Sequence, residues 1–199
     1  MKFMSGFRKF YFIILFLLTI APIIHPQHGA YIAPVIKFSA INGIGSNLLG
    51  VKGGWVINNS FVIGAEYYAL NSNISSNWVI PSTGVSPIIK FTTGGLNFEY
   101  IFIHDNVLSA SAELFMGGAG IILQPSPFYG GDFLVWEPQL NANINLNDWF
   151  HLSLGISYRT TSYLDTYHID GSGNFPPLDF PIKNLRGWTG SVSFIFGVY

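Results

Sequence analysis

The chain contains 199 residues, of which only 10% are charged and 17% are aromatic, and its formal net charge is −1. Soluble domains carry roughly 25% charged residues, so this chain is poor in ions and offers no basic field for nucleic acid. It has no cysteine, which excludes disulfides, thiolate metal sites and an acylated lipoprotein cysteine. This composition suits one domain whose outer surface faces lipid.

Residues 1–29 have the pattern of a secretory signal peptide. Lys2, Arg8 and Lys9 precede an apolar run at 10–24, and Pro26 follows. The run is shorter than the roughly 20 apolar residues expected of a membrane-spanning helix. We therefore predict a helical signal peptide, cleaved somewhere in 25–30, with an uncleaved membrane anchor as the alternative.

From residue 30 onward, apolar and polar side chains alternate with a period of two, which is typical of β-strands. Eight strands are predicted, at 30–41, 47–57, 61–70, 88–103, 107–122, 133–146, 150–163 and 185–199. No later segment is apolar for long enough to form a spanning helix, so a membrane protein built from this chain must be a closed barrel.

The predicted connections alternate in length along the chain. Short turns fall at Asn58–Ser60, His104–Asn106 and Asn147–Trp149, and longer connections at 42–46, 71–87, 123–132 and 164–184. Outer-membrane barrels have an even number of strands, short periplasmic turns and longer outer loops. Residues 30–199 are therefore predicted to be an all-β, eight-stranded antiparallel up-and-down transmembrane β-barrel. Both termini would lie on the periplasmic side of the outer membrane of a Gram-negative-type bacterium.

The turns also predict which residues face each other. A hairpin centred on Asp148 sets Glu137 opposite Arg159, Gln139 opposite Ser157 and Asn145 opposite His151. A hairpin centred on Asn59 sets Lys52 opposite Glu66.

Charged residues within the strands indicate which face lies inside the barrel. A basic residue at mid-depth on the lipid face costs about 2–4 kcal/mol, so the faces that carry charge are expected to point inward. An eight-stranded barrel is barely wide enough for its own side chains, and buried ions must be paired. We therefore predict one luminal charge network that plugs the barrel. Its members are Lys37, Lys52, Glu66, Glu99, Glu113, Glu137 and Arg159.

Large aromatic residues gather near both ends of the predicted strands. Such rings prefer the headgroup depth of a membrane, so they predict two aromatic girdles. Trp55, Phe61, Phe102, Trp149 and Phe150 lie beside the short turns, and Trp136, Tyr158 and Trp188 lie near the long connections.

Four segments carry a family resemblance: the hairpin 53–61, residues 94–100, the strand start 149–159, and the final strand, which ends with Phe194–Tyr199. Through them the chain resembles the small outer-membrane β-barrel domains of the OmpX and opacity-protein type, over roughly 30–199. The resemblance implies recognition of the last strand by the barrel-assembly machinery. One departure is that Tyr199 does not share the face of Phe194 and Phe196.

His151 and Ser153 lie two positions apart on one strand face, which resembles the His-x-Ser arrangement of outer-membrane lipid A deacylases. That chemistry needs the pair at the outer leaflet with a carboxylate to orient the imidazole. Here the pair is predicted to point inward beside a periplasmic turn, which favours a luminal polar layer. His104 and His168 have no histidine close by in the sequence, so neither a metal site nor a cofactor is predicted.

These features favour a non-enzymatic integral membrane barrel that acts in envelope integrity or surface interaction through its outer loops. Its expected contacts are membrane lipid and lipopolysaccharide, and a monomer is expected. A lipid-modifying enzyme and a small solute channel are the alternatives. A secreted soluble barrel with inverted faces is disfavoured, because a water-facing surface needs far more Lys and Glu.

Overall fold

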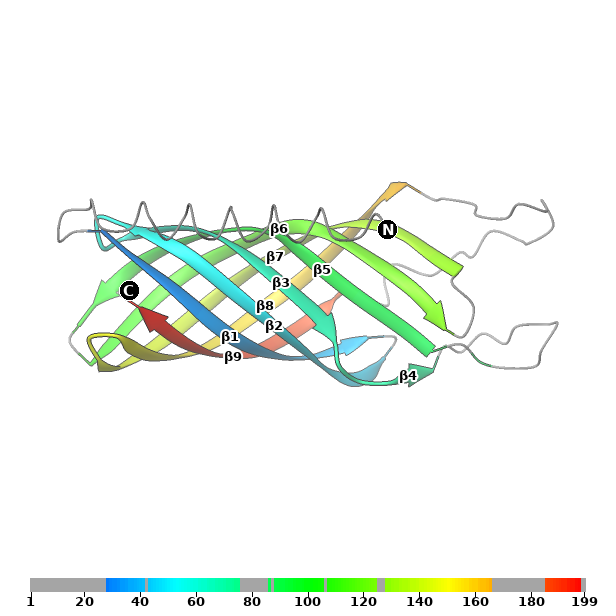
Figure 1. Ribbon diagram of the computed structural model, residues 1–199, viewed down its shortest axis with the longest axis horizontal. Coiled ribbons are helices and arrows are strands. Elements are labelled where there is room, and N and C mark those ends of the chain that lie inside the picture. Colours follow the sequence, from blue (N-terminus) through cyan, green and yellow to red (C-terminus); the bar gives the residue numbers. More distant parts are fainter. Residues whose placement is uncertain are drawn as a thin grey trace, which may run out of the picture.

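The computed structural model describes residues 28–41, 43–75, 86, 88–105, 107–124, 128–165 and 185–197, and these are almost entirely β-strand. Figure 1 shows long strands that run obliquely to the long axis of the molecule. The strands are β1 (His28–Ile41), β2 (Ile44–Ile57), β3 (Phe61–Leu70), β4 (Ile74–Ser75), β5 (Ile88–His104), β6 (Leu108–Gln124), β7 (Phe128–Asn147), β8 (Phe150–Asp165) and β9 (Gly187–Gly197).

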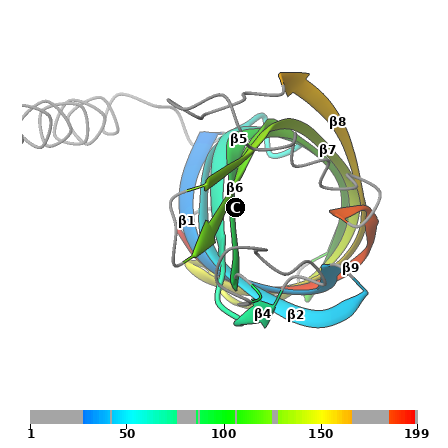
Figure 2. The ribbon, with the colours of Figure 1, turned by 90° about the vertical axis from the view of Figure 1, so that its right-hand side faces the viewer.

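The strands form a closed antiparallel ring. Their order is β3-β2-β1-β9-β8-β7-β6-β5, and β3 also pairs with β5, which closes the sheet on itself. Figure 2 shows this ring along the barrel axis. The two-residue strand β4 pairs with β5 only, so it adds to the rim without entering the ring. The prediction of an eight-stranded antiparallel up-and-down barrel is confirmed. Among the described residues, no helix is long and apolar enough to cross a membrane.

The two ends of the barrel differ in how they connect the strands. At the turn end, short connections join β2 to β3, β5 to β6 and β7 to β8; the opposite end is called the loop end. Asn58 and Asn59 have φ values of 50° and 53°, a left-handed conformation that asparagine tolerates better than most residues. The predicted turn at this position is confirmed.

Two strand limits differ from the prediction by more than two residues, both at the loop end. The connection predicted at 42–46 is a tight turn, because β2 already begins at Ile44 and Gly43 takes a φ of 73° that glycine adopts without steric cost. Strand β7 begins at Phe128 rather than 133, because its ladder with β6 continues to the pair Leu123–Phe128. The glycines at 130 and 131 and a register shift beside Ile121 and Ile122 interrupt the period-two pattern there.

The predicted signal peptide lies almost wholly in residues 1–27, outside the described part of the chain. Strand β1 begins at His28, within the range in which cleavage is predicted.

Side chains alternate between the interior and the outer surface along every strand of the ring. Charged side chains occupy the middle of the interior, and toward the loop end the interior is mainly apolar. The loop-end core is formed by large apolar side chains that include Ile41, Leu48, Leu70, Ile89, Phe91, Ile121, Phe133, Val135 and Leu185, and it is bordered by Phe115 next to Lys37. The charged residues predicted a polar lumen, and this apolar part of the interior was not predicted.

Candidate functional site

The seven members of the luminal charge network come from seven different strands, and all of them face the interior. None is more than 5% exposed. They are Lys37, Lys52, Glu66, Glu99, Glu113, Glu137 and Arg159. Period-two alternation puts them there, because each lies on the face of its strand opposite to the apolar, outward-facing residues.

Lys37 connects three strands in the middle of the barrel. Its ammonium donates a hydrogen bond to Glu137 at 2.7 Å and lies 3.9 Å from a carboxylate oxygen of Glu66. The same nitrogen lies 4.1 Å from the centroid of the Tyr68 ring, and the Tyr68 hydroxyl donates to Glu66. Ser157 donates a further hydrogen bond to Glu137 at 2.8 Å. The buried ammonium is therefore enclosed by two carboxylates and an aromatic face, which compensates for its lost hydration.

Lys52 forms a second ion pair, with Glu113 at 3.1 Å. Asn141 joins this pair to Glu99, since its amide nitrogen donates to Glu113 at 2.9 Å and to Glu99 at 3.4 Å. Ser111 also donates to Glu99. These contacts run from β2 across the lumen to β5, β6 and β7, so the interior is cross-linked between strands that are not neighbours.

The predicted hairpin registers are confirmed for Lys52 with Glu66 and for Gln139 with Ser157. The ion pairs nevertheless form between other partners. Lys52 pairs with Glu113, because a long side chain in a narrow lumen can reach past its cross-strand neighbour.

Arg159 behaves differently from the two lysines. The ladder on both sides sets it opposite Glu137, as predicted, but no ion pair between the two is formed within the described residues. Its guanidinium instead extends toward the loop end. There it donates to the backbone oxygen of Leu185 at 2.7 Å and to the Ser39 hydroxyl at 2.8 Å. Lys37 and Ser157 both donate to Glu137, so this carboxylate has hydrogen-bond partners without Arg159.

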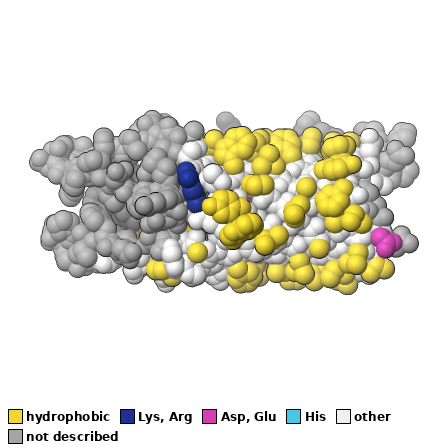
Figure 3. All heavy atoms as spheres, turned by 180° about the vertical axis from the view of Figure 1, so that it is seen from behind, with side chains coloured by type: hydrophobic (Ala, Val, Ile, Leu, Met, Phe, Trp, Pro, Cys, Tyr) yellow, Lys and Arg dark blue, Asp and Glu magenta, His cyan; other side chains and the backbone are white. Residues whose placement is uncertain are grey.

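The outer surface is apolar over a broad band, and Figure 3 shows no charged side chain within the part of this band that it displays. Rings cluster at both ends of the band. At the turn end Phe150 stacks on Phe196 with centroids 5.0 Å apart, and Phe61 lies 4.9 Å from Tyr100. At the loop end Tyr158 meets Trp188 edge-on at 5.3 Å.

The structure places the eight residues of the predicted girdles on the outer face. Trp55 and Phe150 are half-buried, and Phe61, Phe102, Trp136, Trp149, Tyr158 and Trp188 are exposed. Tyr100 and Phe196 contact these rings and were not among the predicted girdle residues. Period-two alternation carried the signal for both, because Tyr100 lies two residues from Phe102 on the outward face of β5, and Phe196 lies on the outward face of β9.

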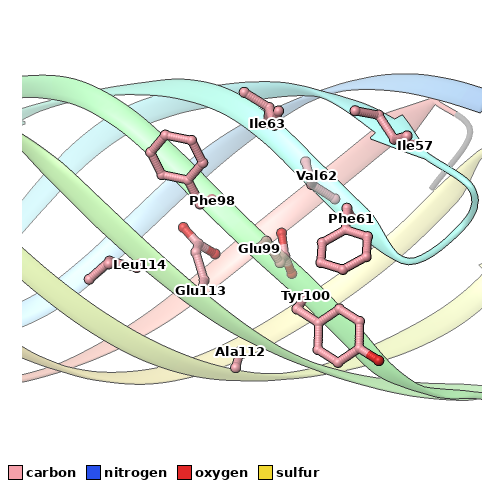
Figure 4. A pocket seen from close by; sticks show the side chains of 10 residues that line it. All are labelled: Ile57, Phe61, Val62, Ile63, Phe98, Glu99, Tyr100, Ala112, Glu113 and Leu114. Atoms are coloured by element: carbon pink, nitrogen blue, oxygen red, sulfur yellow. The ribbon is translucent and has the colours of Figure 1, made fainter.

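A shallow groove of about 520 Å³ lies on this outer surface, over β3, β5 and β6 near the turn end (Figure 4). The exposed side chains of Phe61, Ile63, Phe98 and Tyr100 line it, and the small Ala112 leaves it open. Glu99 and Glu113 alternate with these residues but face the interior. The groove is thus an apolar depression on the outer wall.

The histidine and serine that resemble a deacylase pair do not form a catalytic arrangement. His151 and Ser153 are both buried in the lumen beside the turn end. His151 Nδ1 lies 3.0 Å from the Asn145 side-chain oxygen, where a hydrolase would need a carboxylate. Among the described residues, no group of three or more His, Cys, Asp or Glu is placed to hold a metal ion.

No protein-family model and no curated protein sequence matches this chain. Several solved structures match its fold. The N-terminal β-barrel domain of OprF from Pseudomonas aeruginosa is 13% identical, over 86% of this chain and 98% of that chain, with a TM-score of 0.54. OprG, an outer-membrane protein from the same organism, is 11% identical over 87% and 96%, with a TM-score of 0.53.

Neisserial surface protein A is also similar, at 11% identity over 86% of this chain and 96% of that chain, with a TM-score of 0.50. The fold of this chain is therefore that of the small eight-stranded β-barrels found in outer membranes. The predicted resemblance to barrels of this type is confirmed at the level of the fold.

Proposed function

We propose that this chain is an integral outer-membrane β-barrel without enzymatic activity, which contributes to the envelope or contacts other molecules through its loop end. One observation carries the proposal: the polarity of the barrel is the reverse of that of a soluble protein. Buried ion pairs fill its middle, and large apolar side chains cover its outside. Only a lipid environment makes such a surface stable.

The interior supports a plugged lumen rather than an open pore. Lys37, Lys52 and their carboxylate partners cross-link the middle, and the loop-end core fills the part beyond. A solute would have to displace both layers to pass.

The orientation is part of the same proposal. Outer-membrane barrels have short periplasmic turns, so the turn end would face the periplasm. The longer connections that follow β3, β6 and β8 would then lie at the cell surface. The barrel-assembly machinery would recognise the last strand β9, and the protein would act as a monomer.

A small solute channel is a second candidate, and one observation favours it. Asn97, Ser109 and Ser191 are buried, and side-chain atoms of each form no hydrogen bond within the described residues. Buried polar atoms of this kind are usually satisfied by water, so part of the lumen is expected to be hydrated.

Refolding into phospholipid vesicles, followed by conductance recording in planar bilayers, tests the proposal. The folded barrel should migrate differently from the heat-denatured chain on a gel and should show no steady open state. A protein that stays soluble without detergent would contradict the membrane assignment. A stable unitary conductance would replace the plugged barrel with the channel.

A further inference from the structure

The hydrogen-bonded ladder between β8 and β9 ends before β8 does. It runs from the pair Phe150–Phe196 to the pair Arg159–Gly187. Within the described residues, β8 then continues to Asp165 paired with β7 only. Figure 2 shows the end of β8 standing apart from β9. Two arginines bridge the strands at this point. Arg159 of β8 donates to the Leu185 carbonyl at 2.7 Å, and Arg186 donates to the Thr161 carbonyl of β8 at 2.7 Å.

The two arginines lie on opposite sides of the wall. Arg159 is buried in the lumen, whereas the Arg186 side chain is exposed on the outside. Arg186 uses Nε, at 3.2 Å, and Nη2 for the Thr161 carbonyl. A guanidinium has five N–H donors, so three of those of Arg186 form no hydrogen bond within the described part of the chain. The contact with Thr161 holds the planar group in a fixed direction.

The surface next to Arg186 carries an exposed aromatic side chain. Trp188, two residues further along, is 68% exposed and packs edge-on against Tyr158. Toward the middle of the barrel the wall continues with the exposed side chains of Ile156 and Leu154. The exposed cation of Arg186 therefore lies next to an apolar wall, an arrangement that suits a charged headgroup above acyl chains.

We propose that Arg186 and Trp188 form a binding site for a phosphate group of lipid A in the outer leaflet. This deepens the proposed function and rests on its orientation of the barrel. The pre-ordered guanidinium would hold a phosphate by two parallel charge-assisted hydrogen bonds. The acyl chains would cover the Trp188, Tyr158 and Ile156 side chains, where burial of apolar area adds to the affinity.

Native mass spectrometry of the protein, expressed from the full sequence and purified in detergent, tests the site. The probes are bisphosphorylated lipid A, the same glycolipid without its phosphates, and phosphatidylglycerol. Arg186→Gln removes the charge but keeps an amide donor for the Thr161 carbonyl. The matched control is Lys90→Gln, because Lys90 is a second cation of the loop end and its ammonium contacts Asn73 at 3.2 Å.

The wild-type protein should retain one lipid A, and Arg186→Gln should weaken that retention about tenfold, as expected for loss of one charge-assisted contact. Lys90→Gln should retain lipid A as well as the wild-type protein does. With the glycolipid that lacks phosphates, wild type and Arg186→Gln should show equal retention. Equal weakening by both variants, an unchanged Arg186→Gln, or equal retention of phosphatidylglycerol would each overturn the proposal.

If Arg186→Gln fails to fold, Arg186→Lys serves instead. A lysine cannot contact the Thr161 carbonyl and chelate a phosphate with one planar group, so weaker retention is expected and unchanged retention contradicts the site. Because the measurement is made in detergent, its outcome does not depend on how the barrel is inserted. Failure of the site and failure of the proposed orientation are therefore distinguishable.

Discussion

Side chains fill the middle of the barrel interior and its loop-end part by different kinds of interaction. In the middle, ammonium groups and carboxylates pair across the lumen, and in the loop-end core rings and branched side chains pack against each other. One narrow lumen is thus closed both by directional ion pairs and by non-directional packing.

The two means should respond differently to substitution. A buried ion that loses its partner retains the full cost of its lost hydration, so single changes are severe and paired changes are mild. In an apolar core the cost follows the volume removed, so it is graded and independent of any single partner.

Lys37→Met should produce the largest effect. It leaves Glu137 and Glu66 without their ammonium, and the free energy of unfolding should fall by about 3–5 kcal/mol. The change is measured by unfolding the protein with urea in lipid vesicles and monitoring the folded fraction by its shifted migration on a gel. The double variant Lys37→Met with Glu137→Leu should recover most of the loss. If the double variant were less stable than the single one, the pairing account would be wrong.

Ile156→Arg breaks the outer wall rather than the interior and should have a smaller effect. Ile156 is 56% exposed in the middle of β8, so an arginine there should cost about 2–4 kcal/mol in lipid. The matched control is Leu146→Arg, which is equally exposed but next to the turn, where the cost should be about 0–1 kcal/mol. Equal costs at the two positions would show that this surface does not cross a bilayer.

Ile121→Val should have the smallest effect, because it changes only the apolar packing of the loop-end core. Removing one methyl group from the loop-end core should lower the free energy of unfolding by about 0.5–1.5 kcal/mol. The neighbouring Ile122 points outward, where lipid can fill the space, so Ile122→Val should leave stability almost unchanged. The same urea titration measures the free energy of unfolding of both variants. A larger effect at Ile122 than at Ile121 would contradict the assignment of the two faces.

The local part of this structure was readable from the sequence. Period-two alternation identifies the faces, and the turns at Asn58–Ser60 and Asn147–Trp149 fix the registers of their hairpins. In each hairpin the paired residues are close in the sequence, so their register can be predicted without knowledge of the tertiary structure.

Partner choice across the lumen was not readable. Lys37 and Glu137 are 100 residues apart, and their contact depends on the tilt and stagger of strands around the whole ring. The loop-end core was missed for another reason. Phe91, Phe115 and Phe133 lie on the same inward faces as the charged residues. Alternation predicts which face points inward, but it does not predict where along the strand that face changes from polar to apolar.

Cysteine scanning of β8 tests most directly the claim that the charged face is inside and the apolar face meets lipid. The chain contains no cysteine, so every labelled thiol would be the introduced one. In vesicles, cysteines at the even positions 152–158 should react with a membrane-soluble maleimide and not with a charged one, and those at the odd positions 151–159 should resist the membrane-soluble reagent. Reaction of the even positions with the charged reagent, or the absence of alternation, would contradict the account.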